Sequence, residues 1–267
     1  MNFKLLKYWF LKTILTGEKK KNYERKFSGQ GGTVENILAT PVGYAFRGEN
    51  NRIKLFRNGE EIENVRIPHV NIEVFGSNNF ISLHVEKFES HEASINLSIQ
   101  GNCNRCELEQ GVRGNWNITE YGDNNIMEIG ECTACGEFSI ALHSNHFKIG
   151  KHCMISSSEE LWTDGHSVID CETRELLNYP KAPILIGDHV WLGRRCTLTK
   201  GAQIPNNCIV AIGSIVTKAF TEPNCILAGV PARIVKRGIN WDGRRPVDYQ
   251  KDFEKELMEK QNASDQA

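Results

Sequence analysis

The chain has 267 residues, of which 40% are hydrophobic, and a formal net charge of −1 at pH 7. A charge this close to zero excludes a protein that attracts nucleic acid through its overall positive charge. The length is sufficient for one large domain or two small ones.

Residues 3–15 combine aromatic and aliphatic side chains with lysines at spacings that predict a helix with a wide apolar face. We expect this helix to pack on the rest of the chain or on a partner subunit. The lysines interrupt the apolar run and no small-residue cleavage site follows it, so the run predicts neither a secretory signal nor a membrane span. The protein is therefore expected to be cytoplasmic. Peripheral association with the inner membrane surface through residues 3–21 is the alternative.

A loose repeat fills the middle of the chain. Each copy begins with a glycine, continues through a corner that is usually rich in asparagine and ends in a short run of alternating residues. The copies begin at Gly48, Gly76, Gly101 and Gly122, at separations of 28, 25 and 21 residues. Glycine and asparagine tolerate the positive φ that a sharp corner demands, and the alternating run predicts a short strand. Each copy thus predicts one coil of a β-solenoid plus a variable insertion.

The chain has nine cysteines, and two pairs of them, Cys103 with Cys106 and Cys132 with Cys135, have the spacing of a four-cysteine zinc site. In the register of the repeat, however, Cys106 replaces an inward isoleucine and Cys103 replaces a corner asparagine. Packing therefore explains both residues, and we expect no metal. The cysteine count is odd, and we interpret these residues as reduced, small hydrophobic fillers of a cytoplasmic protein.

Between residues 160 and 183 the repeat gives way to a polar segment, which predicts an inserted loop. His166 lies in this segment. Loops held on a rigid scaffold often carry reactive groups, and an imidazole is suited to deprotonate a hydroxyl near neutral pH. His166 is therefore a candidate general base, and an ordinary loop histidine is the alternative.

After this loop an aliphatic residue recurs at every sixth position: Ile186, Leu192, Leu198, Ile204, Val210 and Val216. A helix has a period near 3.6 and a simple strand a period of 2, so a period of six fits neither. It fits a triangular coil with three short flat faces, each with one aliphatic side chain pointing inward. Residues 18 apart, such as Ile186 and Ile204, would then stack at about 4.8 Å. The pattern predicts an all-β solenoid of the parallel β-helix type.

Beyond Gly238 the chain changes character. Tyr249, Phe253 and Leu257, spaced by four among charged residues, predict a C-terminal amphipathic helix that packs on the solenoid or on a neighbour. Three segments follow from these patterns: an N-terminal helix and loop at 1–40, a β-helix domain at 41–237 with its inserted loop near 160–183, and a C-terminal tail and helix at 238–267. Solenoid repeats share a continuous core, so we expect one folded domain.

The stretch IGDHVWLGRRCTLTKGAQIPNNCIVAIGSIVTKAF, followed by AGVPARIVKR, resembles the C-terminal half of the hexapeptide-repeat acyltransferases. Residues 149–242 resemble most the bacterial O-acetyltransferases that modify capsular and surface polysaccharides. The resemblance implies a left-handed parallel β-helix, a hand that the usual right-handed crossover rule would not predict. It also implies a homotrimer, in which flat faces pack about a threefold axis.

The resemblance further implies transfer of an acetyl group from acetyl-CoA to a sugar hydroxyl of a surface polysaccharide or its precursor. His166 would be the general base, and the indole N–H of Trp191 would stabilise the oxyanion that develops on the thioester. Packing of Trp191 against a neighbouring subunit is the alternative for that residue. No serine or cysteine stands in a recognisable nucleophile-plus-base arrangement, which agrees with direct attack by the hydroxyl.

The phosphates of acetyl-CoA call for cations and free backbone N–H groups. The resemblance implies two sets of residues for this co-substrate. Those toward the phosphates are Thr217, Lys218, Arg233 and Lys236, and those along the pantetheine arm are Lys200, Ala211, Gly213 and Ser214. Ala211 and Ile212 replace the glycine and alanine that are commoner in the family, so the wall beside the arm is bulkier here.

Three other functions stay open at this point. The same base would serve an N-acetyltransferase acting on an amino sugar. A zinc-dependent β-helix enzyme of the carbonic-anhydrase type is a second alternative, although the spacings of His143, His146 and His152 do not match the histidine pair of that family. A non-catalytic scaffold is the third, and His166, Trp191 and the cationic tail argue against it.

Overall fold

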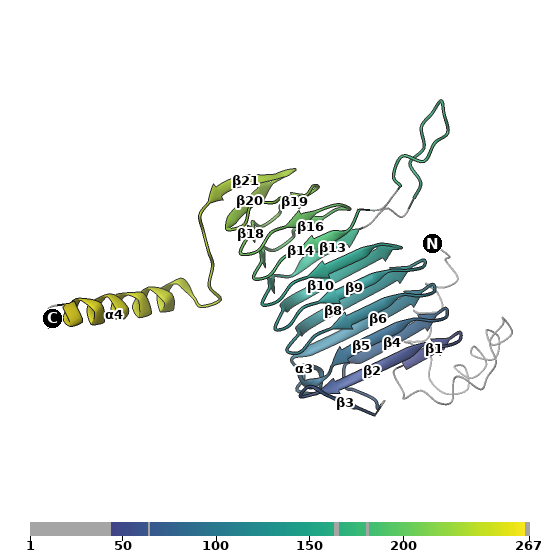
Figure 1. Ribbon diagram of the computed structural model, residues 1–267, viewed down its shortest axis with the longest axis horizontal. Helices are drawn as coiled ribbons and strands as arrows, with labels where there is room; N and C mark the ends of the chain where they lie inside the picture. The colour runs from purple at the N-terminus through teal and green to yellow at the C-terminus, as the bar shows by residue number, and fades with distance from the viewer. Residues whose placement is uncertain (1–43, 64, 163–165, 180–181, 265–267) are drawn as a thin grey trace.

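The computed structural model describes residues 44–63, 65–162, 166–179 and 182–264. The predicted N-terminal helix lies outside these residues. Strands stack as successive rungs of one long solenoid, from β1 (Tyr44–Arg47) to the last pair, β20 (Cys225–Gly229) and β21 (Ala232–Arg237) (Figure 1). This architecture confirms the predicted left-handed parallel β-helix.

Three sheets form the faces of the solenoid. The largest follows the order β1-β4-β6-β8-β10-β12-β15-β18-β20-β21, with β13 (Ser158–Trp162) paired to β10, and only β20 and β21 within it run antiparallel. Its intermediate strands are β4 Val70–Phe75, β6 Ala93–Gln100, β8 Arg113–Tyr121, β10 Ala134–His143, β12 Met154–Ile155, β15 Trp191–Leu192 and β18 Ile209–Val210.

The second sheet follows the order β17-β14-β11-β9-β7-β5-β2-β3. Its strands are β17 Gln203–Ile204, β14 Ile184–Ile186, β11 His146–Ile149, β9 Ile126–Ile129, β7 Arg105–Leu108, β5 Phe80–His84, β2 Arg52–Arg57 and β3 Glu60–Ile62. The third face is short and contains β16 (Thr197–Leu198) paired with β19 (Ile215–Val216).

The registers of these strands confirm the spacings found in the sequence. Ile186 pairs with Ile204 on the next rung, 18 residues later, as the hexad pattern predicts. In the middle of the chain Arg52 pairs with Phe80, Phe80 with Arg105 and Arg105 with Ile126, which reproduces the separations of 28, 25 and 21 residues. Variable insertions therefore leave the stacking of the rungs unchanged.

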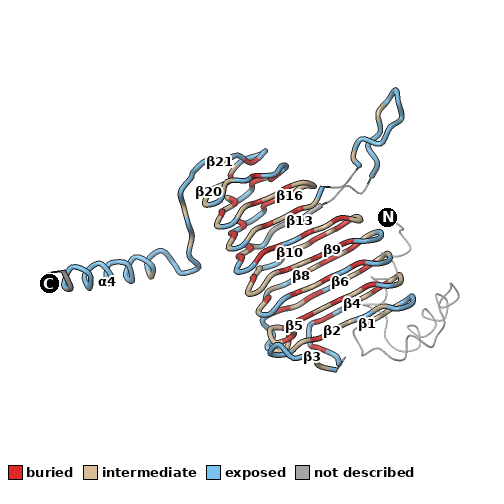
Figure 2. The backbone as a smooth tube through the Cα atoms, viewed as in Figure 1, coloured by how far each residue is buried: buried red, intermediate tan, exposed pale blue. Residues whose placement is uncertain are grey.

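Buried residues recur on successive rungs and form a core along the solenoid axis (Figure 2). Large aromatic side chains fill its wider middle part, where Trp116, Phe138 and Phe147 are fully buried. Cys106, Cys196 and Cys208 are also fully buried, in agreement with their interpretation as apolar fillers. Cys103 stands at a corner with φ +57°, as predicted from the repeat.

One corner of the solenoid contains a ladder of five asparagines, four of them buried, that the sequence patterns did not predict. The side-chain oxygen of Asn79 accepts the backbone N–H of Asn104 at 2.9 Å, and that of Asn104 accepts the backbone N–H of Asn125 at 2.8 Å. Asn51 begins this series and Asn145 ends it. We call these five residues the asparagine ladder. It satisfies backbone donors that a buried corner would otherwise leave without partners.

Among the described residues, two helices accompany the solenoid: α3, a single turn at Glu86–Glu89, and α4 at Pro246–Ser264. Helix α4 extends away from the solenoid (Figure 1), and its stripe of Tyr249, Phe253 and Leu257 is exposed. The predicted C-terminal helix therefore forms but does not pack on its own solenoid, and packing on a neighbour stays a prediction. No helix within the described ranges is long and apolar enough to cross a membrane.

Candidate functional site

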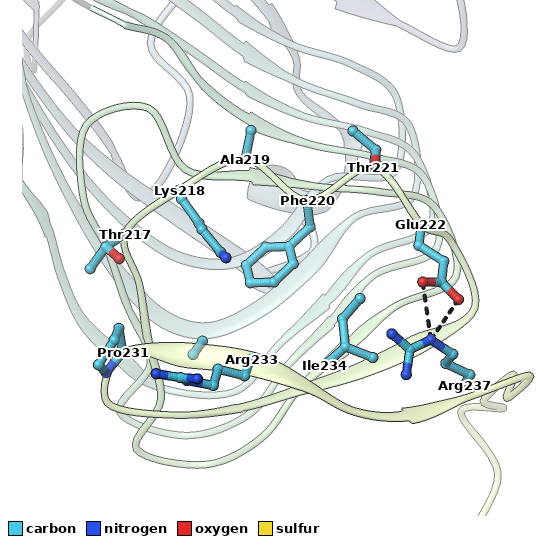
Figure 3. A pocket seen from close by; sticks show the side chains of 11 residues that line it. Thr217, Lys218, Ala219, Phe220, Thr221, Glu222, Pro231, Arg233, Ile234 and Arg237 are labelled. Atoms are coloured by element: carbon cyan, nitrogen blue, oxygen red, sulfur yellow. Dashed lines mark hydrogen bonds and ion pairs between the residues drawn. The ribbon is translucent and has the colours of Figure 1, made fainter.

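A cavity of about 570 Å³ opens at the C-terminal end of the solenoid, between the segment that follows β19 and strand β21 (Figure 3). Its lining comprises Thr217, Lys218, Ala219, Phe220, Thr221, Glu222, Pro231, Ala232, Arg233, Ile234 and Arg237. The sequence analysis named three of these residues, Thr217, Lys218 and Arg233, and the fold brings them together in one place.

The cavity carries an excess of positive charge. Arg237 Nε lies 3.0 Å from a carboxylate oxygen of Glu222, so these two charges compensate each other. Lys218 and Arg233 make no ion pair with any described residue, and the ammonium of Lys218 lies 5.4 Å from the centre of the Phe220 ring. Two uncompensated cations beside an apolar surface are suited to bind an anion that also carries an apolar part.

The other five residues predicted for the co-substrate do not line this cavity. The hydroxyl of Ser214 is buried and accepts the backbone N–H of Gly229 at 3.1 Å, so it fixes the start of the turn into β21. Gly213 adopts φ +70° and a Cβ there would meet no atom within 4 Å, so the space above this turn is open. Ala211 donates its backbone N–H to Leu227, and Lys236 is exposed on β21.

His166 stands at the base of a hairpin that projects from the solenoid (Figure 1). The side-chain amide of Asn178 donates to the carbonyl oxygen of His166 at 2.7 Å, and Lys200 donates to the carbonyl oxygen of Asn178 at 3.1 Å. The histidine is exposed. Lys200, predicted to lie along the pantetheine arm, thus connects the solenoid to the hairpin that positions His166.

Trp191 lies on β15, paired with Met154 on one side and Ile209 on the other, and is 38% exposed. Its ring centre is 6.1 Å from that of Trp241. Neither Trp191 nor His166 lines the cavity described above. Within the described residues, the single chain therefore presents the two candidate catalytic residues on its surface, outside this cavity.

A second cleft, of about 410 Å³, lies where the segment after β21 passes beside β12; its lining includes Arg113, His152, His189 and Trp241. The sequence analysis missed this cleft. Its residues belong to separate rungs and to the tail, and Trp241 bonds to a residue 52 positions away. The strand registers place residues 113, 134 and 154 next to one another on successive rungs. The registers do not predict where the tail lies.

Within the described part of the chain, no three His, Cys, Asp or Glu side chains gather as metal ligands would. Cys106 is buried inside the solenoid and Cys103 is exposed at its corner, so that pair does not converge. Burial raises the pKa of Cys135 to about 12 and that of Cys153 to about 11. Both thiols are therefore protonated at neutral pH.

Comparison with known proteins places these features in context. No protein-family model matches the chain. A polysialic acid O-acetyltransferase of Neisseria meningitidis is 32% identical over 176 residues, which are 65% of this chain and 80% of that protein. A polysialic acid O-acetyltransferase of Escherichia coli O1:K1 / APEC is 34% identical over 115 residues, 42% of this chain. A galactoside O-acetyltransferase of Escherichia coli K12 is 37% identical over 88 residues, 33% of this chain.

The chain spans only 37% and 42% of the lengths of these two Escherichia coli relatives. Among solved structures, that of the polySia specific acetyltransferase NeuO superposes with a TM-score of 0.57 and 21% identity. The superposition covers 76% of this chain and 89% of NeuO, and shows a shared fold.

Proposed function

Because the chain belongs to the hexapeptide-repeat O-acetyltransferases, as its alignment with most of the Neisseria meningitidis relative shows, we propose that it transfers acetyl from acetyl-CoA to a carbohydrate hydroxyl. The acceptor is a capsular or other surface polysaccharide, or its precursor. The observation that carries the proposal is the cationic cavity at the end of the hexapeptide solenoid, where Lys218 and Arg233 lack acidic partners among the described residues. Relatives named for O-acetyl transfer to polysialic acid and galactosides support the choice of a sugar acceptor.

In the proposed reaction the phosphates of acetyl-CoA bind to Lys218 and Arg233. His166 takes the proton of the acceptor hydroxyl as its oxygen attacks the thioester carbonyl. The indole N–H of Trp191 donates to the oxyanion that forms there. The carbon–sulfur bond then breaks, the acetyl group stays on the sugar oxygen, and the proton passes from His166 to the departing sulfur. No acyl-enzyme is formed.

The proposal includes a homotrimer, because neither of the two cavities described above contains His166 or Trp191. In a trimer, His166 of one protomer and Trp191 of the next would line one cleft between them. Light scattering of the active protein is expected to give three times the monomer mass. A strictly monomeric mass together with full activity would contradict the trimer.

Replacing Lys218 or Arg233 by alanine is expected to raise the KM for acetyl-CoA by about ten- to a hundredfold, with a much smaller effect on kcat. Each side chain contacts a phosphate far from the reacting carbonyl, so it stabilises the ground and transition states alike. The loss of one charge-assisted hydrogen bond corresponds to roughly 1.5–3 kcal/mol.

Steady-state kinetics with varied acetyl-CoA test this expectation, and Lys255→Ala on helix α4 is the matched control. Lys255 is exposed and pairs only loosely with Glu259, at 3.9 Å, so its removal should leave the KM unchanged. If neither Lys218→Ala nor Arg233→Ala changes the KM for acetyl-CoA, the phosphates bind elsewhere.

A further inference from the structure

The second cleft is formed where the tail of the chain returns along the solenoid. After β21 the chain runs down one side of the stack before it enters α4 (Figure 1). Trp241 and Gly243 of this tail form one wall of the cleft. The facing wall contains Arg113 at the start of β8, Met154 on β12, and His152 and His189.

The tail wall is held in place by specific contacts. The indole Nε1 of Trp241 donates to the carbonyl oxygen of His189 at 2.7 Å, and the two rings stack with centres 4.2 Å apart and an angle of 8°. His189 is in turn fixed by Asn207, 3.1 Å from its Nδ1. Gly243 lies against Met154, since a Cβ at the glycine would be 3.4 Å from the methionine methyl group. The aromatic wall is thus part of the folded structure.

The lining of this cleft contains one permanent positive charge, the guanidinium of Arg113. The described residues that form it also include two imidazoles, and none is a carboxylate. Arg113 is exposed and makes no ion pair with a described residue. Two acidic groups nearby act on the cleft by Coulombic attraction, Glu92 on Arg113 and Asp242 on His189. Each is paired directly with another cation, since Glu92 lies 3.0 Å from Lys87 and Asp242 lies 2.9 Å from Arg244. The guanidinium of Arg113 therefore keeps its hydrogen-bond donors available for an anion that enters the cleft.

The cleft also lies beside the candidate oxyanion donor. Met154, in its lining, pairs directly with Trp191 on the next rung. The rings of Trp241 and Trp191 have centres 6.1 Å apart. The cleft shares no residue with the cationic cavity at the end of the solenoid. A ligand in the cleft and a molecule whose phosphates occupy that cavity would therefore contact different residues, so the two sites can serve different substrates.

From this arrangement we infer that the cleft binds the acceptor, and that the acceptor unit is a sugar bearing a carboxylate. This inference rests on the proposed function. Arg113 would hold the carboxylate through two parallel N–H···O bonds, a geometry that guanidinium and carboxylate share. The amphipathic indole of Trp241 would pack against the apolar face of the sugar ring, and His152 would bond to its hydroxyls. A neutral sugar would leave the arginine unpaired.

Arg113→Ala tests the inference in kinetics with polysialic acid and polygalacturonic acid as acidic acceptors and dextran as a neutral one. For the acidic acceptor that the enzyme uses, we expect the KM to rise about ten- to a hundredfold, the usual range for one charged hydrogen bond. The KM for acetyl-CoA should stay within about twofold. Arg113→Lys should recover only part of the loss, because it restores the charge without the planar fork. Arg52→Ala, at the start of β2, is the matched control and should behave as wild type.

Equilibrium dialysis with sialic acid oligomers, in the absence of acetyl-CoA, separates this inference from the proposed function. Binding that Arg113→Ala abolishes and Arg52→Ala retains would support the acidic-sugar cleft even if no acetyl transfer were found. The inference is overturned if neither acidic polymer binds, or if dextran binds as tightly as they do. It is also overturned if Arg113→Ala leaves the KM for an acidic acceptor unchanged, although acetyl transfer itself would then stand.

Discussion

Replacing His166 by alanine is expected to lower kcat by about 10² to 10⁴, the usual contribution of a general base. The side chain is exposed at the base of the projecting hairpin, outside the stacked core. The variant should therefore keep its thermal stability, its oligomeric state and its affinity for acetyl-CoA.

Two further variants make this test specific. His146→Ala is the matched control, because His146 lies on β11, bonds to Glu128 at 2.9 Å and has no place in the proposed reaction. Its kcat should equal that of the wild type. Trp191→Phe keeps an aromatic ring and removes the N–H, so a loss of about tenfold or more would support the oxyanion role. Near wild-type turnover of His166→Ala with a true acceptor would show that the proposed mechanism is wrong.

Glu120→Gln is expected to make stability less sensitive to pH: between pH 4.5 and pH 7 the wild type should lose roughly 3 kcal/mol relative to the variant. Glu120 points inward from β8, where its register partners on the neighbouring strands are Ile99 and Leu142. Neither carboxyl oxygen has a hydrogen-bond partner. Desolvation raises the pKa of this carboxyl from 4.5 to about 8. Folding at neutral pH therefore requires a carboxyl that is ionised in the unfolded chain to take up a proton.

The pH dependence of this effect has a definite sign. A folded-state pKa above the unfolded value means that the contribution of Glu120 to stability is fully present below about pH 4.5 and is lost progressively up to about pH 8. Each pH unit within this window changes the free energy of unfolding by about 1.4 kcal/mol. Above about pH 8 the loss is complete. The glutamine has no proton to gain, so the variant should lack this slope.

Urea unfolding of the wild type and of Glu120→Gln at several pH values between 5 and 8 measures the difference. Glu137→Gln is the matched control, because Glu137 lies on the adjacent strand β10 but is exposed. That substitution should leave the slope of the wild type unchanged. Parallel pH profiles for the wild type and Glu120→Gln would contradict a protonated, buried carboxyl.

The last rungs of the solenoid were predictable from the sequence because they contain no insertions. Each face there has six residues, and one aliphatic residue on each face points inward. Ile186, Leu192 and Leu198 are these inward residues on three successive faces. In the middle of the chain the repeated glycine corners indicate where each rung begins, although the insertions between them differ in length. The asparagine ladder was not predictable in this way, because a corner asparagine with positive φ and a buried asparagine that bonds the next rung are adjacent and look alike in sequence.

Only the part of the candidate site that lies in short sequence motifs was predictable. Lys218 and Arg233 lie in short motifs, and they converge because one antiparallel return brings β21 back beside β20. The cleft of Arg113 and Trp241 depends on the path of a tail that crosses several rungs, which no short pattern specifies. Glu120 occupies an inward position that the alternation of β8 assigns to an apolar residue. Its charge therefore appears in the sequence as an exception to the pattern.

The asparagine ladder has a consequence for how this protein can diversify. Its last member, Asn145, donates to the carbonyl oxygen of Ala182 at 3.2 Å, across the 37 residues that include the hairpin with His166. This hydrogen bond holds the next rung in register, whatever the length of the chain between Asn145 and Ala182. Exchange of the hairpin between related proteins should consequently leave the scaffold folded as before. The hairpin with His166 can therefore vary in evolution independently of the solenoid.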